Sequence, residues 1–183
     1  HEQEMDSDLF EDIENLKPVI QPGTSDSAAL DNVFELLNIS GQPAPLAKLM
    51  LVPDAWSKKS KILPKDHQQL FNFLNSTMEP WDGPAAIAGT DNEWVIAAND
   101  RNGLRPLRYT ITKDNFLFAG SETGMIKLNE KKIVAKGRLG PGEIIGVRIE
   151  KGKLFTNEKI KNYLAQEYKN FNNQIIDLDK KIT

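Results

Sequence analysis

A cluster of short polar residues that includes a carboxylate, Asp26, precedes an amphipathic segment in "TSDSAALDNVFELL" (residues 24–37). Leu30, Val33 and Leu37 recur at helical spacing, so a helix is predicted to begin near Ser27. The start of a helix needs a side-chain oxygen that accepts the unpaired backbone N–H groups of the first turn. Residues 24–27 offer four candidates for that task. Asp26 is therefore either the cap or a spare carboxylate, favoured by the helix dipole, for a ligand's ammonium group.

A second candidate site is the turn in "NDRNGLRPLRY" (residues 99–109), which brings Arg101, Arg105 and Arg108 close together in the sequence. An Asn-Gly dipeptide and a following proline favour a tight turn here. The planar guanidinium groups are suited to binding an anion. The alternative is a plain connection between two strands, in which Asp100 and Arg101 form a local ion pair.

Several kinds of chemistry are excluded by residue type. The chain has no cysteine, so these residues hold no disulfide, thiolate metal site or cysteine nucleophile. Its two histidines, His1 and His67, form no HExxH-like pair, so we expect no metal site and no histidine triad. His67 lies in a polar stretch and is predicted to be exposed. The glycine-rich "GRLGPGE" (residues 137–143) precedes a strand pattern, whereas a phosphate-binding loop opens a helix.

The composition is that of a globular domain: 183 residues with 39% hydrophobic and 27% charged residues, and a net charge of −3. Lys and Arg are scattered, which does not favour nucleic-acid binding. No apolar run approaches the ~20 residues that span a bilayer. The first ten residues, "HEQEMDSDLF", lack the pattern of a secretory signal, so we expect a cytoplasmic protein and no membrane partner.

Helical patterns precede strand patterns along the chain. Helices are expected at residues 1–17, from residue 27, within 46–56 after the breakers Gly41, Pro43 and Pro45, and at 65–77. Strands are expected at residues 85–90, 93–99, 108–112, 115–120, 131–137 and 143–150, followed by a hairpin at Gly152 and a last helix capped by Asn157. This order predicts an α+β fold in which helices pack on a meander of antiparallel strands.

Six strings together resemble the class II, or Ntn-type, glutamine amidotransferases, and in particular the glutaminase domain of glutamate synthase large subunits. They are "SDSAALDNVFELL", "LMLVPDAW", "MEPWDGPAAIAGTD", "ANDRNGLRPLRY", "SETG" and "KGRLGPGEIIGVRIEKGKLF". The resemblance implies part of a four-layer αββα sandwich. It also implies hydrolysis of L-glutamine by an N-terminal cysteine whose own α-amine is the general base.

In that family an Asp in a Ser/Thr-Asp-Ser/Thr stretch binds the α-ammonium of glutamine, and Asp26 occupies its place. Ser25, Ser27, Arg101 and Arg105 are secondary candidates. The family's cysteine, its substrate-carboxylate arginine and its Asn-Gly oxyanion pair precede the region matched by His1, so we expect no catalytic residue and no activity in this chain alone. Residues 1–170 are expected to form a partial amidotransferase domain, and residues 171–183 a tail or linker.

The resemblance further implies a parent enzyme of nitrogen assimilation that delivers the ammonia to 2-oxoglutarate. It would carry FMN and an iron–sulfur cluster outside these residues, and its partners would be the remaining glutamate synthase domains and either ferredoxin or an NAD(P)H-linked small subunit. Two alternatives to this interpretation stay open. One is another class II amidotransferase, such as the phosphoribosyl-transferring kind. The other is a non-catalytic module of amidotransferase-like fold that binds an amino acid or an anion.

Overall fold

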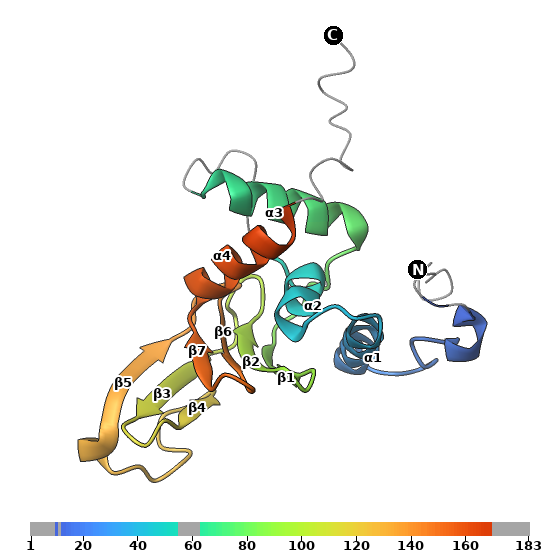
Figure 1. The fold of residues 1–183 in the computed structure, drawn as a ribbon. Coiled ribbons are helices and arrows are strands. Elements are labelled where there is room, and N and C mark those ends of the chain that lie inside the picture. The colour runs from blue at the N-terminus through green and yellow to red at the C-terminus, as the bar shows by residue number, and fades with distance from the viewer. Residues whose placement is uncertain (1–9, 11, 55–62, 170–183) are drawn as a thin grey trace.

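A computed structural model describes residues 10, 12–54 and 63–169 (Figure 1). Its helices are η1 (Ile13–Leu16, a 3₁₀ helix), α1 (Asp26–Ile39), α2 (Ala44–Leu51), α3 (Lys65–Thr77), η2 (Glu130–Lys132, also 3₁₀) and α4 (Asn157–Glu167). Its strands are β1 (Ala86–Thr90), β2 (Trp94–Asn99), β3 (Arg108–Thr112), β4 (Leu117–Gly120), β5 (Ile133–Arg138), β6 (Ile144–Arg148) and β7 (Lys153–Phe155).

The helices follow the predicted patterns with local corrections. The expected helix at residues 1–17 falls largely outside the described residues, and the described part holds only η1. Pro45 does not stay outside α2 but lies in its first turn, where a missing N–H is harmless. Asn157 does not cap α4. Thr156 is the cap residue, while Asn157 Oδ1 accepts a hydrogen bond from the backbone N–H of Ile144 at 3.2 Å.

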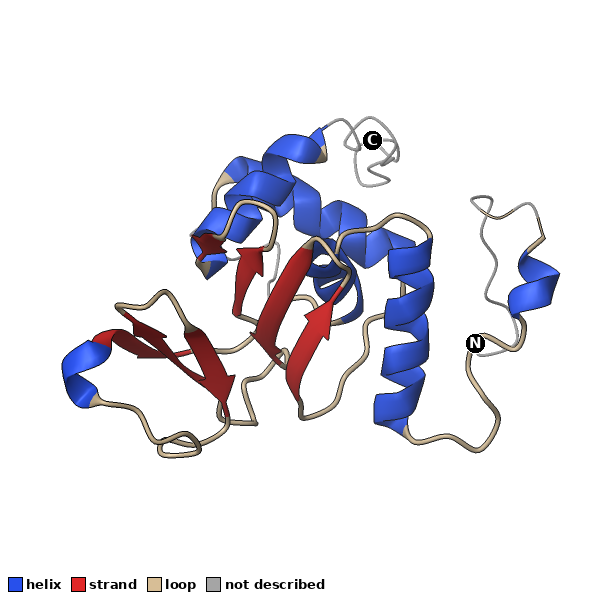
Figure 2. Cartoon of the chain, turned by 60° about the horizontal axis from the view of Figure 1, so that its bottom comes forward, coloured by secondary structure: helices blue, strands red, loops and turns tan. Residues whose placement is uncertain are grey.

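The strands form two antiparallel sheets, in agreement with the αββα sandwich that the resemblance implied, and not the single meander that the strand pattern alone predicted. Their orders are β1-β2-β6-β7 and β4-β3-β5, and Figure 2 shows the strands in two separate groups. β2 pairs with β6, with Ala97 opposite Ile145, so the chain leaves the first sheet, builds the second and then returns. An alternating pattern fixes which face of a strand is buried but not which strand lies beside it. β1, β7, β4 and β5 each have one neighbour within the described residues.

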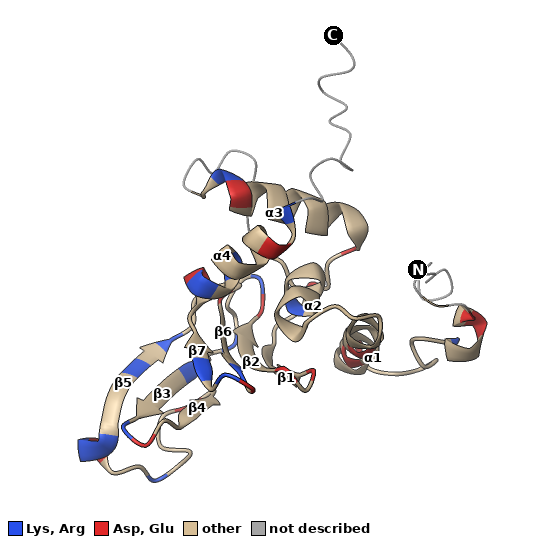
Figure 3. Cartoon of the chain, in the orientation of Figure 1, with Lys and Arg blue, Asp and Glu red and all other residues tan. Residues whose placement is uncertain are grey.

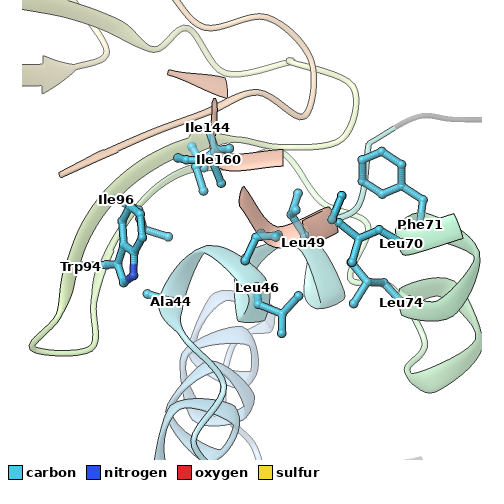
Figure 4. Packing of buried hydrophobic residues seen from close by; sticks show 13 residues of the cluster. Ala44, Leu46, Leu49, Leu70, Phe71, Leu74, Trp94, Ile96, Ile144 and Ile160 are labelled. Carbon is cyan, nitrogen blue, oxygen red and sulfur yellow. The ribbon is translucent and has the colours of Figure 1, made fainter. Parts of the chain in front are cut away.

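One face of the larger sheet packs against helices. Trp94 and Ile96 of β2 and Ile144 of β6 point into a core shared with α2, α3 and α4 (Figure 4). Burial of these apolar side chains is the main force that holds the helices on the sheet. The cluster consists of Ala44, Leu46, Leu49, Leu70, Phe71, Leu74, Trp94, Ile96, Ala98, Ile144, Ile160, Leu164 and Ala165.

The opposite face of the larger sheet meets the second sheet at one end. Ala97 and Ile145 cluster with Leu107 and Leu139, and Tyr109 of β3 packs against this cluster. Towards the other end the face is open, with 49% of Val95 exposed. The described residues thus supply layers of helices, sheet and sheet, which confirms the α+β class.

Candidate functional site

The first turn of α1 settles which residue is the helix cap. Ser25 is the cap residue, and its Oγ accepts a hydrogen bond from the backbone N–H of Ala28 at 3.3 Å. Ser27 Oγ lies 3.2 Å from Ser25 Oγ, so the two hydroxyl groups form a local pair. Asp26 is the first residue of the helix and is exposed. Its carboxylate therefore does not serve as the cap.

The position of Asp26 favours a negative charge and a positive ligand. Backbone N–H groups at a helix start and the helix dipole both stabilise an anionic side chain there. Every charged residue of α1 is acidic, as Figure 3 shows for the helix, whereas Lys and Arg are spread over both sheets and the other α-helices. Within the described residues, the Asp26 side chain forms no hydrogen bond or ion pair. An external ammonium group is the kind of ligand that this carboxylate suits.

A buried carboxylate organises the turn at residues 100–105, which we name the arginine turn. Asp100 is 1% exposed. Its Oδ1 accepts from the N–H groups of Asn102 at 3.0 Å and Leu104 at 3.1 Å. Its Oδ2 accepts from the N–H groups of Arg105 at 3.1 Å and Ala85 at 3.2 Å. These four bonds, and not the predicted pair of Asp100 with Arg101, define the turn.

The charge of Asp100 is held by its hydrogen bonds. Burial alone would raise the pKa of the Asp100 carboxyl. The four backbone N–H groups outweigh that effect and hold the pKa below its ordinary value. Gly103, at φ +65°, adds a close approach, because a Cβ there would lie 3.0 Å from atoms of Pro141. The arginine turn is therefore a rigid element.

The two predicted arginines lie on this turn but not in a closed site. Arg105 is exposed and Arg101 is partly exposed. Neither guanidinium group forms an ion pair within the described part of the chain. Both are open to an anion, such as the carboxylate of an amino acid.

The segment before β1 connects the arginine turn to the start of α1. At one end of it, Trp81 Nε1 donates to the carbonyl oxygen of Asp26 at 3.2 Å. At the other end, the N–H of Asp100 donates to the Ala85 carbonyl at 3.0 Å. The structure thus joins Ser25, Asp26 and Ser27 at the helix start and places the arginine turn at the far end of residues 81–85.

A larger hollow lies elsewhere in the described part of the chain. A groove of about 630 Å³ runs over the second sheet and is lined by Tyr109, Phe118, Met125 and Ile126 among others. Asp26, Arg101 and Arg105 do not line it. We give more weight to the helix start, because its chemistry matches an amino-acid ligand and the groove is an open surface over a single sheet.

Sequence reasoning missed a buried cationic group. Lys48 of α2 is 1% exposed, and its Nζ donates to the Gly142 carbonyl at 2.7 Å. The available signal was a lysine inside the apolar run "LAKLMLV". The prediction for His67 was also wrong. It is 5% exposed, and its Nε2 lies 2.7 Å from Asn162 Oδ1, which joins α3 to α4.

Comparison with known proteins decides the family. The model of the family "Glutamine amidotransferases class-II" matches residues 1–173. The chain belongs to the class II glutamine amidotransferases. The resemblance found in the six strings is therefore confirmed.

Relatives of this amidotransferase chain include glutamate synthases. It is 51% identical over 166 residues to a glutamate synthase [NADPH] large chain of Azospirillum brasilense, covering 90% of this chain and 11% of that protein. It is 40% identical over 179 residues to a glutamate synthase [NADH] of Saccharomyces cerevisiae, covering 96% and 8%. It is 41% identical over 160 residues to a ferredoxin-dependent glutamate synthase 2 of Synechocystis, covering 86% and 10%. The chain thus spans about a tenth of the length of these relatives.

Two features are absent from residues 10, 12–54 and 63–169. No helix in these ranges combines the length and apolar character needed to cross a bilayer. In the same ranges, no group of three or more His, Asp or Glu side chains is placed to hold a metal ion.

Proposed function

We propose that this amidotransferase chain forms the glutamine-ammonium site of a glutaminase domain within a longer glutamate synthase. One observation carries the proposal. Ser25 caps α1, which leaves the adjacent carboxylate of Asp26 exposed and without a partner in the described residues. A helix start that needed only a cap would not require this additional carboxylate beside the Ser25 hydroxyl.

The substrate in this proposal is L-glutamine. Asp26 binds its α-ammonium by a charge-assisted hydrogen bond, and the hydroxyl groups of Ser25 and Ser27 line the same helix start. Arg101 and Arg105 remain secondary candidates at the anionic end of the site, beside the family's substrate-carboxylate arginine, which is expected outside this chain. The reaction is hydrolysis of the side-chain amide to glutamate and ammonia.

The nucleophile belongs outside these 183 residues, which contain no cysteine. An activated cysteine attacks the amide carbon, ammonia leaves, and water hydrolyses the resulting thioester. This chain contributes substrate binding and orientation. By itself it is proposed to be inactive, and the partial domain is proposed to cover residues 1–170, with residues 171–183 leading towards the next domain.

The rest of the proposed enzyme uses the ammonia for reductive amination of 2-oxoglutarate in the cytoplasm. Its flavin, FMN, and its iron–sulfur cluster are proposed to bind other domains. The absence of cysteine from these 183 residues supports that placement of the cluster, because cluster ligands are mainly cysteine thiolates. Electrons would come from ferredoxin or through an NAD(P)H-linked small subunit.

Replacement of Asp26 in the intact polypeptide tests this proposal. Hydrogen bonds to charged groups contribute about 1.5–3 kcal/mol, so Asp26→Asn should raise the glutamine KM by about 10-fold to 150-fold. Turnover with added ammonia in place of glutamine should stay unchanged, because no glutamine α-ammonium group then has to be bound by Asp26. Steady-state kinetics with each nitrogen donor provides both values.

Glu35→Gln is the matched control, since Glu35 is an exposed acidic residue of the same helix. It should leave both reactions unchanged. Equal glutamine KM values for Asp26→Asn and wild type would refute the assignment of Asp26. Glutamine binding by calorimetry without any glutaminase activity of the intact protein would instead favour the non-catalytic binding module.

A further inference from the structure

Lys48 stands out because nothing in its helix requires a charge. Seven of the eight residues of α2 are apolar, and Leu46, Leu49 and Leu51 are buried with it. An ammonium group removed from water loses its hydration, so an apolar side chain would stabilise this position better unless the charge has a partner. Burial lowers the pKa of Lys48 to about 8.

The lysine has a specific hydrogen-bond partner. Its Nζ donates to the carbonyl of Gly142 at 2.7 Å, in the turn at residues 139–143 that we name the glycine turn. The opposing charges nearby are Asp54 and Asp100, which raise the pKa of Lys48, while Lys161 lowers it. Lys161 is itself paired with Asp54, so the cluster is close to electrically balanced.

The glycine turn is held from its other side by the residues that begin the arginine turn. Asn99 Nδ2 donates to the Leu139 carbonyl at 2.9 Å. The N–H of Gly142 donates to the Asp100 carbonyl at 2.8 Å. A Cβ on Gly142 would lie 2.8 Å from Asp54 Oδ1, so the backbone fits closely here. The glycine turn is therefore clamped between Lys48 and the arginine turn.

Lys48 also adjoins the helix that carries Asp26. Together with Leu30 and Phe34 of α1 and Ile87 of β1, it lines a cavity of about 60 Å³. The lysine thus lies between α1 on one side and the glycine turn on the other.

We propose that Lys48 is a positioning residue for the glutamine site, which fixes the arginine turn relative to Asp26 by clamping the glycine turn. It touches no substrate. This inference rests on the proposed function, because the clamp is proposed to position part of the glutamine site. A buried charged donor suits this role, because its hydrogen bond to the Gly142 carbonyl is directional and holds the glycine turn in one position, whereas an apolar contact is compatible with several positions.

The test uses Lys48→Met in the intact polypeptide. Loss of the charged donor should raise the glutamine KM about tenfold, as expected for one hydrogen bond to a charged group. Turnover with ammonia should not change. In hydrogen–deuterium exchange, peptides that cover the arginine turn and the glycine turn should exchange about tenfold faster than in wild type, because a local opening becomes easier. The peptide that covers β7 should exchange at its original rate.

Two further variants make the result decisive. Lys48→Gln is measured in parallel and carries the same expectation, so the test survives if Lys48→Met fails to fold. Lys136→Met is the matched control, because Lys136 is an exposed lysine of β5. It should change neither kinetics nor exchange in the two turns.

Unchanged exchange in both turns would overturn the clamp. Faster exchange with an unchanged glutamine KM would overturn the positioning role. Absence of glutamine-dependent activity in the wild-type protein would refute the proposed function itself. That outcome can be distinguished from a failure of the clamp, because hydrogen exchange in the two turns is measured without any substrate.

Discussion

Replacement of Asp100 by asparagine is the sharpest test of how the arginine turn is built. The two carboxylate oxygens accept four backbone N–H groups, two at each oxygen. Asparagine keeps one carbonyl oxygen and puts an NH₂ group in place of the other. At least two N–H groups therefore lose their acceptor, in a site where Asp100 is 1% exposed.

The loss can be estimated from the hydrogen bonds. An unsatisfied buried donor costs about 1–3 kcal/mol, so two of them should lower the free energy of unfolding by about 2–6 kcal/mol. That is a large share of the ~5–15 kcal/mol that stabilises a typical domain. The assay is urea unfolding of the chain at pH 7, at several protein concentrations, with the slope of the transition compared between variants.

The pH dependence supplies a second readout. The pKa of Asp100 is held below its ordinary value in the folded chain, so its charge stabilises the fold above the unfolded pKa of about 3.9. This stability is lost as the pH falls through the folded pKa. The difference between wild type and Asp100→Asn should therefore be constant from pH 7 to about pH 4 and shrink below it.

Asp114→Asn is the control, because Asp114 is an exposed aspartate whose partner, Lys132, is also exposed. Its unfolding midpoint should stay close to that of wild type. If Asp100→Asn matched Asp114→Asn at pH 7, the Asp100 carboxylate would not be what holds the arginine turn, and its four hydrogen bonds would contribute no more than a surface ion pair.

Two other predictions concern the glycine turn and Lys48. Gly142 and Gly152 both have positive φ, but only Gly142 faces a neighbour within 4 Å, the side chain and Cα of Asp54. Each change to alanine should lower the free energy of unfolding, measured in urea, by about 1–2 kcal/mol because alanine disfavours a left-handed backbone. Gly142→Ala should lower it further, because the added Cβ would meet Asp54. Equal losses for the two variants would contradict the close packing at Gly142. For Lys48, burial lowers the pKa to about 8, so the folded chain releases this proton before the unfolded chain does. The free energy of unfolding of wild type minus that of Lys48→Met should therefore rise between about pH 8 and about pH 10.4, by up to about 1.4 kcal/mol per pH unit. A difference that does not change over this pH range would contradict the lowered pKa of Lys48.

The proposed site combines two rigid elements with one exposed carboxylate. Ser25 fixes the start of α1, and Asp100 fixes the arginine turn, so the side chains offered to a ligand project from ordered backbone. Ligand binding then requires less ordering of the protein, which favours affinity. Capping, turn formation and binding are thus assigned to different residues.

The sequence by itself determined the local elements and the family. The spacing of Leu30, Val33 and Leu37 predicted α1, and the prediction of a helix at residues 65–77 coincides with α3. The six strings identified the class II amidotransferases, which the family comparison confirmed. These features depend on neighbours in the chain, and their patterns are therefore visible in one dimension.

Tertiary structure decided the pairing of strands and the roles of polar residues. Both the pairing of β2 with β6 and the split into two sheets depend on contacts between distant segments. His67 is buried because α4 covers it, and Asp100 binds backbone N–H groups, including that of Ala85, in place of Arg101. Lys48 acquires its role only where Gly142, 94 positions later, meets its ammonium group. Local patterns set the conformation of each segment. A buried polar group, however, has lost its hydrogen bonds to water, so it pairs with whichever polar group the tertiary structure places within hydrogen-bond distance.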